Sequence, residues 1–296
     1  MYHNPVMPEE VLKGLSISSG GTYVDATFGG GGHAKGILEH LGNGKLIAFD
    51  QDDEAQRNLP DDPRVIFVNH NFRFMKNFLR WHDCIPVDGI LADLGVSSHQ
   101  IDASERGFST RFDGPLDMRM NQSAKTTAAE VLNSYSVEKL ADLFYFYGEL
   151  RNARHIASAI EKQRATNALQ TTEQLSALLK PMAPRGREMK FLAQAFQALR
   201  IEVNGELEAL KEFLTQCTDV VKPGGRLVVI AYHSLEDRLV KNFIRSGNFE
   251  GNIEKDLYGN YSTPFRQMSK VVAASEKEIK ENSRARSARL RIAQKN

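Results

Sequence analysis

The chain has 296 residues, of which 41% are hydrophobic and 25% charged, and its formal net charge is +1. This length suits one large domain or two modest ones, and the average composition excludes wholesale disorder. A net charge near zero does not exclude a nucleic-acid partner, because a basic face can be hidden in a neutral total.

The cysteines and the hydropathy pattern indicate in which cellular compartment the protein is expected. Cys84 and Cys217 are the only cysteines, and neither stands in a CxxC or zinc-ligand spacing, so we expect no disulfide framework and no metal site. The N-terminus lacks the basic and apolar regions of a signal peptide. The longest apolar run, Leu227–Tyr232, is too short to cross a bilayer. We therefore expect a cytoplasmic protein without membrane contact.

The first third of the chain alternates short β-type runs with helical patterns, which is typical of a parallel sheet covered by helices. We predict strands at residues 22–27, 45–50, 65–69 and 89–93, with helices at 34–41 and 53–58.

Helical patterns then replace the strands from about residue 123 to residue 207. We predict helices at residues 137–148, 151–163, 172–179 and 191–199. A strand returns at 223–232, and a polar tail with a basic end begins at about residue 250. The economical interpretation is an α/β domain of the Rossmann-like type, residues 1–104 and 207–296, interrupted by an all-helical domain, residues 105–206.

Four consecutive glycines, Gly29–Gly32, stand between the first predicted strand and the first helix. Glycines at this position let the backbone approach a ligand closely. Residues 29–34 fit the GxGxxA dinucleotide fingerprint, and Asp50 follows about 20 residues later, as that fingerprint requires. Taken alone, the match favours a dinucleotide only weakly, and the glycines could also form a plain flexible turn.

The charges at the strand ends distinguish a dinucleotide from S-adenosylmethionine as the cofactor. Three predicted strands end at or near an acid, namely Asp25, Asp50 and Asp93, and open α/β sheets bind ligands at these strand ends. Three carboxylates would repel a pyrophosphate but suit S-adenosylmethionine, which carries an ammonium and a sulfonium. We predict that Asp50 binds the ribose hydroxyls, that Asp25 and Asp93 hold the methionine end, and that Phe72 packs on the adenine. Alternatively, these acids merely cap helices or lie in turns.

The residues after the fourth and fifth predicted strands indicate which kind of atom accepts the methyl group. Carbon methylation of a pyrimidine normally needs a cysteine nucleophile, but Cys84 precedes the fourth strand and Cys217 falls in a predicted helix. Methylation of an exocyclic amine instead needs groups that orient the amine and take its proton. Asp93 and His233 are the candidate catalytic residues, with a structural histidine as the alternative for His233.

Seven segments share one resemblance. They are Thr27–His33, Asp93–Ser98, Arg106–Ser109, Gly114–Met120, Phe196–Ile201, His233–Arg238 and Arg284–Ser287. In their order along the chain and in their residues, these segments closely resemble the bacterial small-subunit (16S) ribosomal RNA cytosine-N4 methyltransferases. The resemblance runs from Tyr2-His3 to the basic C-terminal segment. Gly-Pro-Leu-Asp-Met-Arg-Met is the most specific segment, because nothing in general sheet physics requires it.

The resemblance implies a class I methyltransferase sheet with an inserted helical domain, and methyl transfer from S-adenosylmethionine to N4 of a cytidine in the decoding region. Carried over by motif, the cofactor contacts are Gly31, Gly32, His33, Asp50, Phe72, Asp93 and Gln100. Two positions depart from the family. His99 stands where many relatives have proline, and Ala193–Ala195 stand where many have Thr-Arg-Thr.

The expected partner is 16S ribosomal RNA within the small ribosomal subunit, held by salt-dependent phosphate contacts. The predicted RNA-binding residues are Arg106, Arg119, Arg200, Arg284 and Arg286. We expect the helical insertion and the basic tail to form this surface, although single arginines are usually solvated and the tail could be a plain basic terminus. The oligomeric state is open, with a homodimer as one option.

Three other functions compete with this interpretation. The GxGxxA match supports an NAD-dependent dehydrogenase, which the strand-end acids oppose. A non-catalytic RNA-binding assembly factor could keep the same fold, although the intact Asp93 and His233 segments speak against it. A methyltransferase for protein or small-molecule amines is the third, and the resemblance opposes it.

Overall fold

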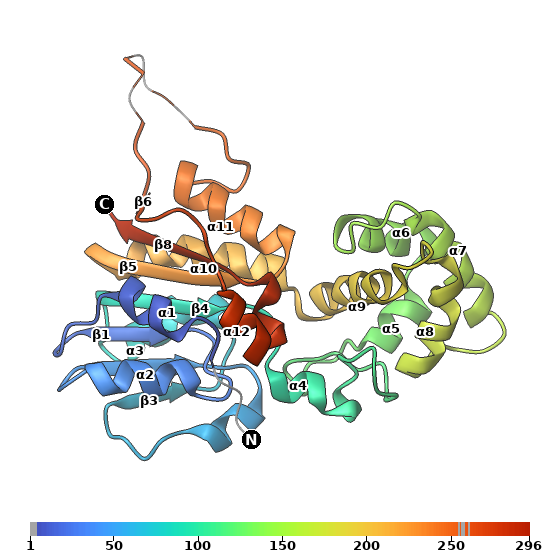
Figure 1. Ribbon diagram of the computed structural model, residues 1–296, viewed down its shortest axis with the longest axis horizontal. Coiled ribbons are helices and arrows are strands. Elements are labelled where there is room, and N and C mark those ends of the chain that lie inside the picture. The colour runs from blue at the N-terminus through green and yellow to red at the C-terminus, as the bar shows by residue number, and fades with distance from the viewer. Residues whose placement is uncertain (1–4, 254, 256–257, 260) are drawn as a thin grey trace. The chain divides into compact units, whose positions relative to one another are not determined.

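The structure is a computed structural model that describes residues 5–253, 255, 258, 259 and 261–296 (Figure 1). It divides into two compact units. Met1–Gly95 and Leu207–Asn296 form the first, which we call the sheet unit, and Val96–Glu206 form the second, the helical unit. Tyr2 and His3, with which the family resemblance begins, lie outside the described residues. The predicted domain boundary at residues 104 and 105 stays a prediction.

Within the described residues, the sheet unit holds an eight-stranded sheet of order β3-β2-β1-β4-β5-β8-β6, with β7 also paired to β8. The strands are β1 (Thr22–Asp25), β2 (Lys45–Phe49), β3 (Val65–Val68), β4 (Val87–Asp93), β5 (Val221–Ala231), β6 (Phe265–Gln267), β7 (Val272–Ala273) and β8 (Arg289–Lys295). Strands β1 to β5 are parallel, and β8 is antiparallel to its neighbours. The predicted strands and the Rossmann-like parallel sheet are confirmed. The strand order reverses beside β1, where such sheets bind ligands.

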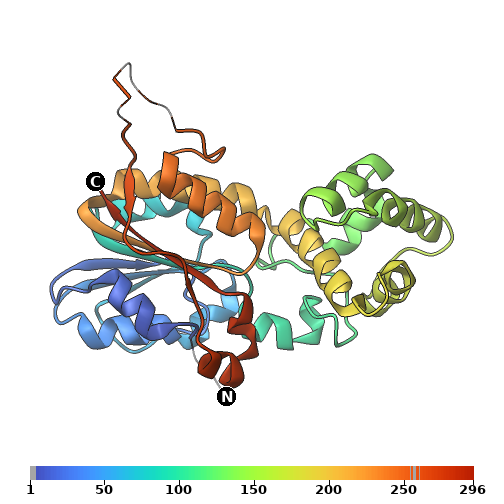
Figure 2. The ribbon, with the colours of Figure 1, turned by 45° about the horizontal axis from the view of Figure 1, so that its top comes forward.

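Helices cover both faces of this sheet (Figures 1 and 2). The helices of the sheet unit are α1 (Pro8–Leu15), α2 (Gly32–His40), α3 (Met75–Trp81), α10 (Glu206–Val220, of which Glu206 belongs to the helical unit), α11 (Ser234–Ser246) and α12 (Glu276–Glu281). Helices α3, α10 and α11 bury one face, and α1 and α2 bury the other. Strands covered on both sides read as continuous apolar runs, which is why β4 and β5 stood out in the sequence.

The C-terminal segment is part of the sheet and not a polar tail. Strand β8 lies between β5 and β6, and Leu290 and Ala293 are fully buried (Figure 2, red). Arg291 is also buried, and its Nε and Nη2 donate to the two carboxylate oxygens of Asp237 at 2.7 and 3.0 Å. This corrects the expectation of a basic tail. The sequence did not indicate a strand here, because a charged residue, Arg291, occupies a buried position of β8 where an apolar residue would be expected.

The helical unit is built around its own apolar core. Its helices are α4 (Ser98–Asp102), α5 (Ala128–Ser134), α6 (Val137–Phe146), α7 (Ala153–Arg164), α8 (Thr172–Leu179) and α9 (Glu188–Asn204). The four predicted helices are confirmed, while the short α4 and α5 were not predicted. Thr127 and Glu130 form a capping box at the start of α5, and this spacing was a usable signal in the sequence. No helix in the described part of the chain is long and apolar enough to cross a membrane.

Candidate active site

The acids at the ends of three adjacent strands lie together at one edge of the sheet. Asp25 ends β1, Asp93 ends β4, and Asp50 directly follows β2, and β1 lies between the other two strands. Burial raises the pKa of Asp25 to about 6, and the charges of Asp93 and Asp50 add to this effect while that of nearby His33 opposes it. Burial likewise raises the pKa of Asp50 to about 6. The carboxyl ends of these strands therefore carry an acidic cluster in which Asp25 is buried and Asp50 and Asp93 are half-buried.

The glycine turn after β1 closes over this cluster. The Gly29 N–H donates to Oδ2 of Asp50 at 2.7 Å, and the Gly31 N–H donates to the Phe28 carbonyl at 2.8 Å. Gly31 has a φ of 74°, and a Cβ there would lie 3.0 Å from the Phe28 ring. The left-handed backbone therefore favours glycine at this position, and a Cβ would also crowd the Phe28 ring. The turn leads into α2 with His33 as its second residue.

The carboxylate of Asp93 has a polar neighbour beside each of its oxygens. The Tyr232 hydroxyl donates to Oδ1 at 2.8 Å, and His33 Nε2 lies 3.5 Å from Oδ2. The Asp93 backbone N–H donates to Oγ1 of Thr27 at 2.7 Å. Burial lowers the pKa of His33, but the neighbouring carboxylates of Asp93 and Asp25 outweigh this effect and raise that pKa. Burial and the charge of Asp93 raise the pKa of Tyr232, which therefore stays a neutral donor.

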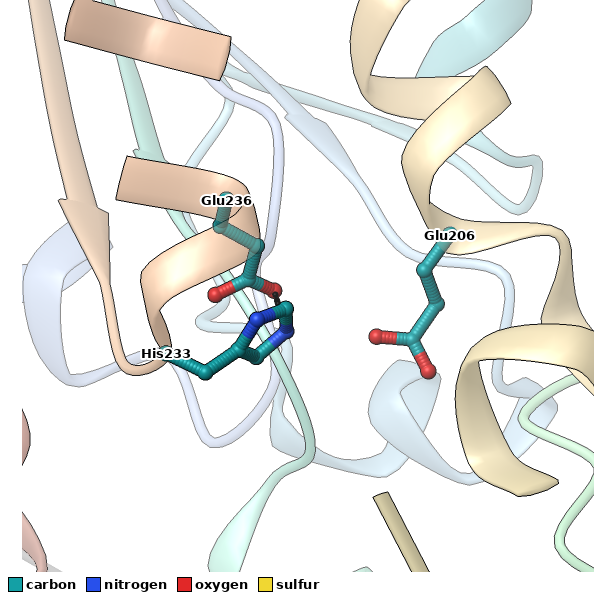
Figure 3. A group of neighbouring side chains, drawn as sticks. All are labelled: Glu206, His233 and Glu236. Carbon is teal, nitrogen blue, oxygen red and sulfur yellow. Dashed lines mark ion pairs between the residues drawn. The ribbon is translucent and has the colours of Figure 1, made fainter. Parts of the chain in front are cut away.

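His233 lies two residues after β5, at the N-cap position of α11 but without a side-chain capping hydrogen bond, and it faces Glu236 (Figure 3). Nε2 of His233 lies 3.1 Å from Oε1 of Glu236, an ion-pair distance if the ring is protonated. Oε2 of Glu236 accepts the Tyr232 N–H at 3.1 Å. Neither ring nitrogen of His233 has a hydrogen-bond partner among the described residues. Figure 3 also draws Glu206, which belongs to the helical unit.

The remaining predicted cofactor residues lie in different units. Phe72 follows β3 in the sheet unit, is half-buried, and packs edge-on against Phe213 with ring centroids 5.1 Å apart. Gln100 lies in the helical unit, where its Oε1 accepts the Ser97 N–H at 3.0 Å in the capping box of α4. His99 stands in the first turn of this helix, where a proline would also be tolerated.

Three of the predicted RNA-binding arginines make contacts within the helical unit. Arg106 is buried, and its Nη2 donates to the carbonyls of Arg119 and Met120 at 3.0 and 3.1 Å. Arg119 forms a two-pronged ion pair with Asp117, with N–O distances of 2.8 and 2.6 Å. Arg200 pairs in the same way with Glu206, at 2.8 and 2.9 Å. RNA contact by these three residues stays a prediction.

The other two predicted arginines, Arg284 and Arg286, lie in a 3₁₀ turn of the sheet unit, Ser283–Ser287, directly before β8. Arg284 is half-buried and Arg286 is exposed. The departure at residues 193–195 has a structural role. Gln194 Nε2 donates to the Gly148 carbonyl at 3.0 Å and so holds the turn between α6 and α7.

Tyr232 and Glu236 were absent from the predicted site. Tyr232 directly follows β5, and its hydroxyl reaches Asp93 because β5 pairs with β4. Glu236 stands three residues after His233, the spacing that brings side chains together in the first turn of a helix. The spacing of Glu236 from His233 was visible in the sequence, whereas the contact of Tyr232 with Asp93 required knowledge of the strand order.

Replacing Asp25 with asparagine should change how stability depends on pH. The folded-state pKa of about 6 lies above the ordinary 3.8, so stability contributed by this group is complete below about pH 4 and lost as pH rises through 6. Removing the charge should therefore favour Asp25→Asn over wild type by about 1–2 kcal/mol more at pH 8 than at pH 5. Thermal melting at both pH values measures this difference. The exposed Asp61→Asn should show no such trend, and a parallel shift in both variants would contradict the assignment.

The chain matches the MraW methylase family over residues 1–296. A protein named ribosomal RNA small subunit methyltransferase H from Bacteroides thetaiotaomicron is 57% identical, covering 99% of this chain and 97% of that protein. Proteins of the same name from Christiangramia forsetii and Cytophaga hutchinsonii are 56% and 53% identical, covering 99% and 100% of this chain and 98% and 100% of their own lengths. The likeness therefore extends over both the sheet unit and the helical unit.

Proposed function

Since the chain belongs to the MraW methylase family, we propose that it transfers a methyl group from S-adenosylmethionine to the N4 amine of a cytidine in the decoding region of 16S ribosomal RNA. The family resemblance predicted from the seven segments is confirmed. The name of the relatives supports ribosomal RNA of the small subunit as the substrate class. With a ribosomal substrate we expect the enzyme in the cytoplasm, and a homodimer stays a prediction.

The observation that carries the proposal is the acidic cluster at the ends of β1, β2 and β4. Oδ2 of Asp25 is buried and has no hydrogen-bond partner among the described residues. Burying a carboxylate oxygen without a hydrogen-bond partner is unfavourable in free energy. A cationic ligand would reduce this penalty, whereas a pyrophosphate would increase it. This feature supports S-adenosylmethionine and opposes the dinucleotide of a dehydrogenase.

The three acids of the cluster each have a role that fits this group. Asp25 and Asp93 would hold the ammonium of the methionine end. Asp50 accepts the backbone N–H of Gly29 on one oxygen and that of Asp52 on the other, and a carboxylate has further lone pairs for the ribose hydroxyls. When bound, S-adenosylmethionine supplies the electrophilic methyl group.

We assign the proton of the exocyclic amine to Asp93. Its carboxylate is oriented by Tyr232 on one oxygen and by His33 beside the other, and its side chain keeps 22% exposure. An oriented and reachable carboxylate is what a general base requires. His233, held beside Glu236, is a second candidate for orienting the base.

Carbon methylation through a cysteine is disfavoured on two grounds. Cys84 and Cys217 are both buried, and neither stands at the carboxyl end of a strand of the sheet. Burial raises the pKa of both thiols, which opposes the thiolate that a nucleophile needs. An exocyclic amine is therefore favoured over a ring carbon as the acceptor of the methyl group.

Replacing Tyr232 with phenylalanine should slow methyl transfer about tenfold, because one hydrogen bond that orients Asp93 is lost while the ring is kept. Single-turnover transfer at saturating S-adenosylmethionine measures the rate, and calorimetry measures the Kd of S-adenosylmethionine, so that slower transfer is distinguished from weaker cofactor binding. The exposed Tyr261→Phe is the control. An unchanged rate in Tyr232→Phe would show that Asp93 does not depend on this contact.

Transfer of labelled methyl groups to small subunits that lack this modification, followed by nucleoside analysis, tests the proposed function. N4-methylated cytidine is the expected product. A product methylated at carbon 5, or on protein, would overturn the acceptor assignment. Binding of S-adenosylmethionine without any transfer would favour the assembly factor, and binding of NADH in its place would favour the dehydrogenase.

A further inference from the structure

A short exposed segment of the helical unit concentrates positive charge. Residues 180–190, which we call the basic turn, contain Lys180, Arg185, Arg187 and Lys190 but only one acid, Glu188. All four cations are exposed. No hydrogen bond or ion pair joins their side chains to any residue in the described part of the chain, so their charges are available to a partner.

The backbone of the basic turn presents two of these cations at its tip. The Arg187 N–H donates to the Pro184 carbonyl at 2.9 Å, which closes a four-residue turn. Gly186 has a φ of 73°, and a Cβ there would meet nothing within 4 Å. The tip therefore lies clear of the rest of its unit, with Arg185 and Arg187 on either side of Gly186.

The single acid does not neutralise the tip. Oε1 of Glu188 accepts the Gly186 N–H at 2.9 Å, so this carboxylate braces the turn from inside. Hydrogen bonds from its own backbone and from Gly186 lower the pKa of Glu188, and the charge of Lys180 lowers it further. The carboxylate thus remains an acceptor for the backbone, while the arginines remain without an acidic partner.

Arg106, Arg119 and Arg200 show the opposite arrangement. Each of them donates to a carbonyl or a carboxylate of the helical unit. An arginine that already satisfies a partner gains less from a phosphate, because the existing contact must first be broken. The basic turn is therefore better suited to a polyanion than the arginines that the sequence motifs suggested.

We propose that the basic turn binds the sugar–phosphate backbone of the RNA substrate. The proposal rests on the proposed function, since it takes RNA as the polyanion. Exposed lysines and arginines on a protruding turn supply salt-dependent affinity and fix orientation, and they read no sequence. The base itself is selected elsewhere.

The test compares two variants with equal loss of charge. The first carries Lys180→Gln, Arg185→Gln, Arg187→Gln and Lys190→Gln. The matched control carries Lys125→Gln, Arg151→Gln, Arg154→Gln and Lys162→Gln, which are exposed positions of the same unit. Binding to protein-free 16S ribosomal RNA and to isolated small subunits is measured from 50 to 300 mM KCl. Thermal melting and the Kd of S-adenosylmethionine confirm that both variants are folded.

In the basic-turn variant, the Kd for RNA should rise on the order of 100-fold near physiological salt, and the slope of log K against log salt should flatten by about 3. The control should lose only a few-fold. Wild-type affinity in the basic-turn variant would overturn the proposal, and so would an equal loss in the control, which would indicate a net-charge effect. Loss on subunits but not on RNA would assign the turn to a ribosomal protein and also overturn it.

Methyl transfer by the wild-type protein is measured in parallel and separates the two proposals. A flattened salt slope in the variant, with no transfer by the wild type, would support the basic turn as an RNA contact and reject the proposed reaction. Transfer by the wild type, with an unchanged slope in the variant, would reject the basic turn alone.

Discussion

Replacing Asp93 with alanine is expected to slow methyl transfer by about 10²- to 10⁴-fold, the contribution typical of a general base. The carboxylate lies where the Tyr232 hydroxyl and His33 Nε2 converge, at 2.8 and 3.5 Å. Its loss would remove the proposed proton acceptor, together with the carboxylate that the Tyr232 hydroxyl contacts. Single-turnover transfer to small subunits measures the effect, and calorimetry with S-adenosylmethionine separates it from weaker cofactor binding.

Asparagine at the same position sharpens the test. Asp93→Asn keeps an oxygen for the Tyr232 hydroxyl but cannot take a proton at neutral pH, so its rate should fall almost as far as that of Asp93→Ala. The exposed Asp61→Ala serves as the control for loss of one acid. If Asp93→Asn kept about a tenth of the wild-type rate or more, Asp93 would be an orienting group and not the base.

Ending the chain at Asn282 is expected to abolish folding of the sheet unit. Strand β8 pairs with β5 over six residues, from Arg226 to Ala231, and with β6 on its other side. Its loss exposes both neighbouring strands and removes the fully buried Leu290 and Ala293. The combined cost is comparable with the whole stability of a domain, about 5–15 kcal/mol. Circular dichroism and thermal melting should show no cooperative transition for this unit.

The same strand offers a milder variant and a matched control. Arg291→Ala should lower the free energy of unfolding by about 3–5 kcal/mol, because Asp237 is left largely buried without its partner. Arg289→Gln, on the exposed side of β8, should change it by less than about 0.5 kcal/mol. A truncated chain that melts cooperatively at the wild-type temperature would refute the central role of β8. Loss of RNA binding on truncation would therefore not locate an RNA contact.

The sequence alone was sufficient for the features that depend on neighbours along the chain. Strands β1 to β5 were visible because each is a short apolar run bounded by turn residues. The acids at the ends of β1, β2 and β4 followed from that alternation, since parallel strands end at the same edge. The segments of the glycine turn and of residues 114–120 pointed to the family that the comparisons then established.

The tertiary structure alone decided which side chains meet. The bond between Tyr232 and Asp93 exists because β5 lies beside β4, although the two residues are 139 positions apart in the chain. Arg291 appeared to be part of a basic tail until β8 placed it against Asp237, and Arg106 and Arg119 appeared free until their partners folded around them. A charged side chain carries no local sign of whether a partner will neutralise it, because that contact forms only when distant segments pack.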